Sequence, residues 1–151
     1  MRKRVIADAT ADNHWIDLEN LAQVEISSEE PAHPIEHALT GEGRGWRAAS
    51  GGEQIVRLLF DEPRAVRLVE LRFEEHLNQR TQEFVLRWSP DSGRSYRDVV
   101  RQQYTFSPPG TTTEVEQFTV NLSGVTALEL RVIPDINDGR AVASLSRLGV
   151  A

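Results

Sequence analysis

The sequence contains no cysteine, which excludes disulfide bonds and thiolate chemistry. A chain without cysteine suits a reducing compartment, although many exported bacterial proteins also lack it. No apolar run approaches the ~18 residues that a membrane-spanning helix needs. The basic start Met1–Arg4 is followed by Asp8 and Asp12 rather than by the apolar core of a secretion signal. We therefore expect a bacterial, cytoplasmic protein with no membrane span.

Lysine is nearly absent, since Lys3 is the only one among 17 basic residues and all the others are arginine. With 23 acidic residues the formal net charge is -6, and a net acidic chain is a poor general binder of nucleic acid. Arginine pairs well with carboxylates and with anionic ligands. Surface pairing with the many glutamates is the favoured role, and anion binding stays open as the alternative.

Motifs for covalent catalysis and for phosphate binding are missing, so we expect a protein that is not an enzyme. The segment from His33 to His37 matches the H-x-x-E-H pattern of some zinc hydrolases. That chemistry needs a stable helix and a third ligand, whereas Pro34 and Gly41 leave room for only a short helix. We predict a surface helix, no metal site and no cofactor.

Alternation of apolar and polar residues dominates the chain, and this period of two is typical of strands with one buried face. It predicts an all-β fold, an antiparallel jelly-roll β-sandwich of about eight strands with one short helical segment. The predicted strands are 23–27, 54–60, 65–73, 81–89, 98–106, 114–123, 127–133 and 141–150.

The clearest element is the hairpin over residues 83–100. Phe84, Leu86 and Trp88 alternate with Glu83, Val85 and Arg87, and residues 89–93, Ser-Pro-Asp-Ser-Gly, supply turn chemistry before the chain returns.

The chain divides into an N-terminal segment, 1–22, and one domain, 23–151. We expect the first 14 residues to be frayed or lightly docked, and the apolar residues that follow, Trp15 to Leu21, to lie against the domain. Residues 29–53 are expected to form a long irregular insert, in which Pro34 opens a helical turn and Gly41 ends it.

Several segments resemble the discoidin, or coagulation-factor type C, domain of the galactose-binding-like superfamily. They are Val24–Glu29, the segment Pro34–Gly41 followed by Trp46, Gln54–Pro63, Phe84–Gly93 and, loosely, Leu145–Val150. The chain departs from the family in lacking its terminal cysteine pair, in placing Thr40 before Gly41 where the family has Asp, and in inserting Ser92 between Asp91 and Gly93. The second departure weakens any transfer of the Ca²⁺ site that some members carry.

The resemblance implies a non-catalytic binding module that recognises a carbohydrate or similar polar ligand through loops at one end of the sandwich. The alternative that it leaves open is an intracellular protein–protein interaction or scaffold domain. The expected partner is accordingly a glycan, another polar small ligand or a protein.

Strand alternation also locates the binding end, because successive antiparallel strands put their connections at opposite ends. Short turns at 61–63, 90–95 and 123–126 then share one end. The long connections 29–53, 74–80, 107–113 and 134–140 share the other, and long loops in a compact domain are usually functional.

Polar and aromatic residues in or beside these long connections are the candidate ligand-binding residues. For the two aromatic candidates, Tyr104 and Phe106, packing in the core is the favoured alternative to ligand stacking. The candidates are His76, Asn78, Arg80, Tyr104, Phe106, Asn137 and Arg140.

Overall fold

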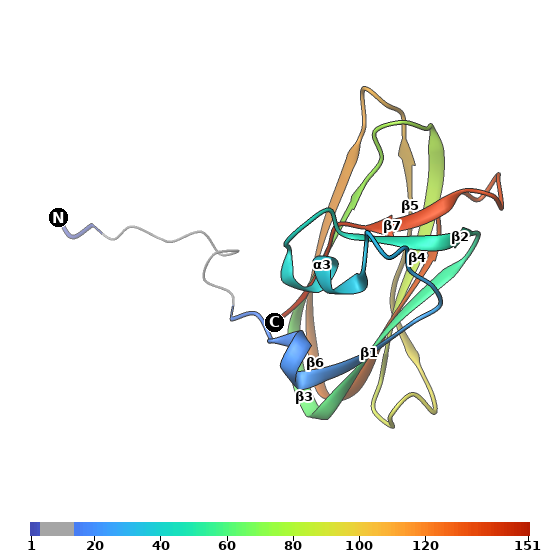
Figure 1. Cartoon of the computed structure of the whole chain (residues 1–151). Coiled ribbons are helices and arrows are strands. Elements are labelled where there is room, and N and C mark those ends of the chain that lie inside the picture. The colour runs from blue at the N-terminus through green and yellow to red at the C-terminus, as the bar shows by residue number, and fades with distance from the viewer. Residues whose placement is uncertain (4–13) are drawn as a thin grey trace.

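A computed structural model describes residues 1–3 and 14–151 of the chain. The expected fraying of the first 14 residues falls mostly outside these described residues. Helix α2 (Leu18–Leu21) follows, and its Leu18 is buried in the core. The Ile16 amide donates to the Val150 carbonyl, 2.8 Å away, so this segment does lie against the domain, beside the C-terminus (Figure 1).

Eight strands are described after α2, together with the short helix α3 (Ile35–Thr40). This confirms the predicted all-β sandwich. The strands are β1 (Ala22–Ile26), β2 (Trp46–Gly51), β3 (Gln54–Glu74), β4 (Arg80–Ser89), β5 (Arg97–Phe106), β6 (Thr113–Ile133), β7 (Val142–Leu145) and β8 (Arg147–Val150).

The two long strands β3 and β6 build both layers. They pair antiparallel along their lengths, with register shifts between Leu59 and Leu68. On one side of this bend their halves join β1, β4 and β5 in one layer, and on the other side β8 pairs with β3 in the second layer. The layers face each other through Phe73 and Phe84, whose rings stack 5.3 Å apart.

The prediction of chain-reversing turns at 61–63 and 123–126 was wrong. Both are bends inside continuous strands. Proline cannot donate to a sheet ladder, so Pro63 falls where the register shifts, and Gly124, with φ of 66°, allows β6 to bend beside it. The partner strands bend together, so pairing resumes instead of ending in a hairpin.

The 29–53 insert contains a strand, β2, that was not predicted. The last predicted strand, 141–150, is divided into two strands, β7 and β8. β2 and β7 form a separate two-stranded sheet, while β8 belongs to the main sheet. Helix α3 is confirmed, with Pro34 before it and Gly41, at φ of 75°, ending it.

The two ends of the sandwich differ as expected. In Figure 1 the bends and the β4–β5 turn lie at the lower end, and the connections after β3, β5 and β6 lie at the upper end. The fourth long connection is different, because α3 and its flanking loops lie along the flank of the sandwich rather than at the tip.

Candidate functional site

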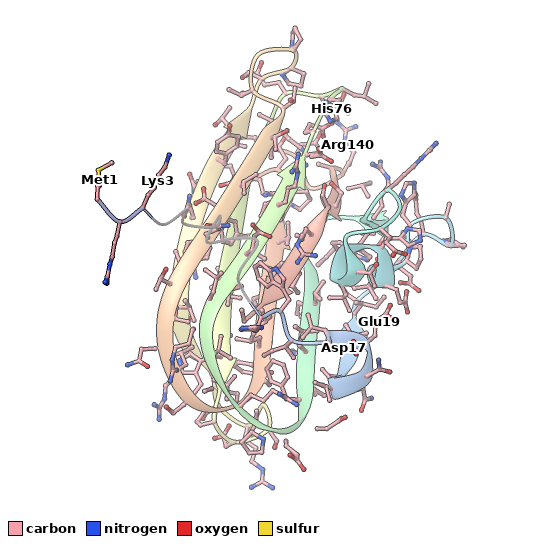
Figure 2. The ribbon with its side chains drawn as sticks, turned by 90° about the vertical axis from the view of Figure 1, so that its left-hand side faces the viewer. Met1, Lys3, Asp17, Glu19, His76 and Arg140 are labelled. Atoms are coloured by element: carbon pink, nitrogen blue, oxygen red, sulfur yellow. The ribbon has the colours of Figure 1, made fainter. Side chains whose placement is uncertain are left out.

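A cleft of about 520 Å³ opens at the long-loop end, and we call it the loop-end cleft. It lies between the β3–β4 loop, the β6–β7 loop and the small β2–β7 sheet. The residues that line it are Arg47, Glu75, Leu77, Asn78, Gln79, Arg80, Asp135, Asp138, Arg140, Ala141 and Val142. Figure 2 shows His76 and Arg140, from two of these loops, at the same end of the molecule.

One buried ion pair fixes the β3–β4 loop. The Arg80 side chain is 3% exposed, and its Nε donates to Glu75 at 2.7 Å. The other carboxylate oxygen of Glu75 accepts hydrogen bonds from the backbone amides of Leu77 and Asn78. Burial opposes the charge on Glu75, but the bonds from Arg80 and the two amides outweigh it and lower the pKa of this carboxyl.

Arg80 also joins this loop to the next one. Its Nη1 donates to the Pro134 carbonyl at 2.7 Å and to Gln82 Oε1 at 3.1 Å. The Ile136 amide donates to the Thr81 carbonyl at 2.9 Å. The two loops that form the cleft are thus held together before any ligand binds, which lowers the entropy cost of binding.

The far wall of the cleft carries a second, exposed ion pair. Asp138 accepts bonds from the backbone amide and the guanidinium of Arg140, whose side chain is 92% exposed. These bonds lower the pKa of Asp138 and raise that of Arg140. With Arg47, Arg80 and Glu75 already named, and Asp135 beside Thr81, the cleft wall holds three arginines and three carboxylates.

A buried polar layer lies beneath the cleft. Gln82 is fully buried and Glu114 is 2% exposed, and within the described part of the chain neither Gln82 Nε2 nor the Glu114 carboxyl has a hydrogen-bond partner. Burial, and after it the neighbouring Glu116, raise the pKa of Glu114 to about 8. Glu114 is therefore mostly protonated at neutral pH.

The structure brings together only some of the predicted residues. Asn78, Arg80 and Arg140 line the loop-end cleft, and His76 lies in a neighbouring hollow on the flank. Asn137 is exposed in the β6–β7 loop, where its backbone amide donates to Asp135 Oδ1, but it is not part of the cleft wall.

The two aromatic candidates lie behind the cleft. Phe106 is fully buried, with the Arg80 guanidinium 4.8 Å from the centre of its ring, so its selection as a ligand contact was wrong. Tyr104 is partly buried, packs against Phe106 at 4.9 Å and donates to the Thr113 carbonyl. Core packing, the alternative left open for this pair, describes Phe106 fully and Tyr104 largely.

Sequence reasoning missed the carboxylates of the cleft and Arg47. Glu75 stands in a pair of glutamates with the composition of a solvated loop, yet it is the partner that makes Arg80 tolerable in a buried position. A usable signal was the spacing of Glu75 and Arg80 across one short loop between two strands. Arg47 gave no signal, because its strand β2 was itself unpredicted.

Within the described residues, neither histidine of the H-x-x-E-H segment belongs to a cluster of possible metal ligands. Among the described residues, no group of three or more His, Asp or Glu side chains is placed to hold a metal ion. No helix in the described part of the chain is long and apolar enough to cross a membrane.

Comparison with known proteins places the fold. No protein-family model matches the sequence, and no curated protein is similar to it in sequence. Solved structures do match: a pectin-binding carbohydrate-binding module has 16% identity and a TM-score of 0.63, covering 87% of this chain and 90% of its own. The family 32 carbohydrate-binding module of Clostridium perfringens NanJ, in complex with galactose, has 14% identity and a TM-score of 0.64, covering 85% and 92%.

The chain shares the jelly-roll fold of these carbohydrate-binding modules. This fold also occurs in reduced XRCC1 bound to the DNA pol beta catalytic domain, with 17% identity, a TM-score of 0.61 and coverage of 87% of this chain and 95% of that one. At these identities the likeness is one of fold, and the function has to be argued from the cleft.

Proposed function

We propose that this chain is a non-catalytic module that binds a carbohydrate in the loop-end cleft. The observation that carries the proposal is the position of this preorganised polar cleft at the loop end of a jelly roll that pectin-binding and galactose-bound modules share. Its wall offers guanidinium and amide donors beside carboxylate acceptors, the groups that hydrogen-bond sugar hydroxyls.

The ionisation of the cleft supports binding rather than hydrolysis. Glycoside hydrolysis needs a carboxylic acid with a raised pKa at the scissile bond. Glu75 and Asp138, which do line the cleft, have lowered pKa values. Glu114 has the raised pKa, but it is buried beneath the cleft and does not line it.

A protein-interaction role is not favoured by the surface. Among the described residues, the large apolar side chains that are exposed are Met1, Leu77, Val115 and Ile136. These are four single side chains on four segments, too few for the apolar core that stable protein interfaces contain. Cytoplasmic location, which the composition suggested, stays a prediction.

Calorimetric titration of the full chain with galactose and with oligogalacturonides tests the proposal. The informative variant is the double change Asn78→Ala and Arg140→Ala, because both side chains are exposed and the fold does not depend on them. Losing two hydrogen bonds of about 1 kcal/mol each weakens binding roughly 30-fold.

Arg94→Ala is the matched control, since Arg94 is an exposed arginine in the β4–β5 turn at the opposite end. It should bind as tightly as the wild type. If no saccharide binds, or if the double variant binds like the control, the loop-end cleft is not a carbohydrate site.

A further inference from the structure

A second hollow adjoins the loop-end cleft on the flank of the sandwich, and we call it the flank hollow. It has a volume of about 180 Å³ and shares Arg47 with the loop-end cleft. The other residues that decide its chemistry are His33, Arg44, Glu74 and His76.

One strand runs past both hollows. Ala141 and Val142, at the start of β7, line the loop-end cleft, and Ser144 and Leu145 line the flank hollow. At a strand rise of ~3.3 Å per residue, Val142 and Leu145 are about 10 Å apart. A ligand of two or more sugar units can therefore reach from one hollow into the other.

The two hollows differ in charge. The wall of the loop-end cleft balances three arginines with three carboxylates, whereas the flank hollow has two arginines and two histidines with Glu74 as its one carboxylate. Glu74 is engaged already, because it accepts a hydrogen bond from Ser146 Oγ at 2.9 Å and lies 3.5 Å from Arg72. The flank hollow thus has more hydrogen-bond donors and positive charges than carboxylates to pair with them.

Arg44 is the cation that this excess leaves free. It is exposed and has no ion pair among the described residues, while Arg47 lies 3.5 Å from Glu30, both side chains being more than 40% exposed. The guanidinium fork of arginine matches a carboxylate geometrically.

The backbone fixes the loop that presents Arg44. Gly45 has φ of 78°, and a Cβ there would lie 2.6 Å from the Leu145 carbonyl oxygen. Gly43 has φ of 69°, and a Cβ there would lie 2.6 Å from His37 Nδ1. Glycine on each side of Arg44 lets the loop press against β7 and α3, which holds Arg44 at the mouth of the flank hollow.

We propose that the flank hollow binds the carboxylate of a uronic acid unit, in an acidic oligosaccharide whose neighbouring unit occupies the loop-end cleft. This inference rests on the proposed function and adds to it the charge and the minimum length of the ligand. Arg44 supplies the bidentate contact, and Arg47, between the two hollows, contacts both units.

The test compares two probes by calorimetry on the full chain: trigalacturonate, and α-1,4-linked galactotriose, which carries a hydroxymethyl group in place of each carboxylate. Wild-type protein should bind trigalacturonate at least roughly tenfold more tightly, since a hydrogen bond to a charged group contributes about 1.5–3 kcal/mol. This preference should shrink as salt is added, because both partners are exposed to solvent.

Arg44→Gln should remove the preference, because it should lower the affinity for trigalacturonate by much more than the affinity for galactotriose. Arg94→Gln, the same change at the opposite end, should alter neither affinity. Equal binding of both probes by the wild type, or an equal loss for both probes in Arg44→Gln, overturns the assignment. So does binding of a sulfated galactotriose as tight as that of the uronate.

The two proposals fail differently. If neither trisaccharide binds, the carbohydrate function itself is wrong. If both bind with the same affinity, and the Asn78→Ala, Arg140→Ala variant weakens both, the loop-end cleft is a carbohydrate site and only the flank hollow has been misassigned.

Discussion

Glu114 makes the stability of this protein depend on pH, and the sign can be worked out from its environment. Its pKa rises from the usual 4.5 to about 8 in the folded chain, chiefly through burial. The folded state therefore holds a proton that the unfolded state releases in this range. The contribution of Glu114 to stability is therefore greatest below about pH 4.5, falls as the pH rises, and levels off above about pH 8.

Glu114→Gln removes this dependence while keeping the shape of the side chain. Between the two pKa values the wild type loses about 1.4 kcal/mol of unfolding free energy for each pH unit. The free energy of unfolding of the variant, relative to that of the wild type, should therefore rise by roughly 3 kcal/mol between about pH 5 and about pH 7.5. Since Glu116 adjoins Glu114, the measured curve belongs to the pair of carboxyls.

Urea unfolding followed by tryptophan fluorescence at several pH values measures this difference. Glu62→Gln is the matched control, because Glu62 is exposed at the strand bend and its replacement should leave the curve parallel to that of the wild type. A Glu114→Gln curve that also runs parallel to the wild type would refute the reasoning, since it would mean that Glu114 is ionised in the folded protein.

Two further changes probe the strands away from the cleft. Glu129 is 1% exposed and accepts bonds from Arg57, Arg87 and Arg131, so Glu129→Gln should cost about 3–5 kcal/mol in urea unfolding at neutral pH. Burial opposes the charge on Glu129, but the arginines outweigh it and lower the pKa of this carboxyl. The difference in unfolding free energy between the wild type and Glu129→Gln should therefore shrink in acid. A difference that does not change with pH would contradict this role of Glu129. Ser92 has φ of 61°, which glycine adopts freely, so Ser92→Gly should raise the free energy of unfolding by roughly 0.5–1 kcal/mol, and a loss of stability would show that the turn does not strain Ser92.

Most strands and the long-loop end could be predicted because both follow from local patterns. Phe84 and Leu86, at alternate positions, are buried as expected, and Asp91 accepts the turn bonds from Ser89 and Ser95 that its position indicated. Counting alternate connections then placed three of the four long connections at one end, since an antiparallel strand reverses direction whatever its partner.

The errors arose where the tertiary structure decides. Asp61-Glu62-Pro63 has the composition of a turn, and only the pairing of β3 with β6 across it turns the segment into a bend. Likewise Arg80 has the composition of a surface residue. Its partner Glu75 is near in sequence, but nothing local shows that the Pro134 carbonyl will help to bury it. Burial of this kind is invisible to periodicity, because part of the surroundings comes from a distant loop.

The burial of Arg80 has a consequence for how the loop-end cleft is interpreted. Arg80 already uses its Nε and Nη1 in bonds to Glu75, Gln82 and the Pro134 carbonyl, so its main contribution is to the positions of Asn78 and of the β6–β7 loop. Removing it would leave Glu75 as a partly buried carboxylate without its cation, which is costly, and both loops would loosen together. Replacing Arg80 thus cannot separate binding from folding, whereas exposed Asn78, Arg140 and Arg44 can. The proposed binding specificity accordingly rests on side chains at the rim, and the buried pair beneath them holds the loops in place.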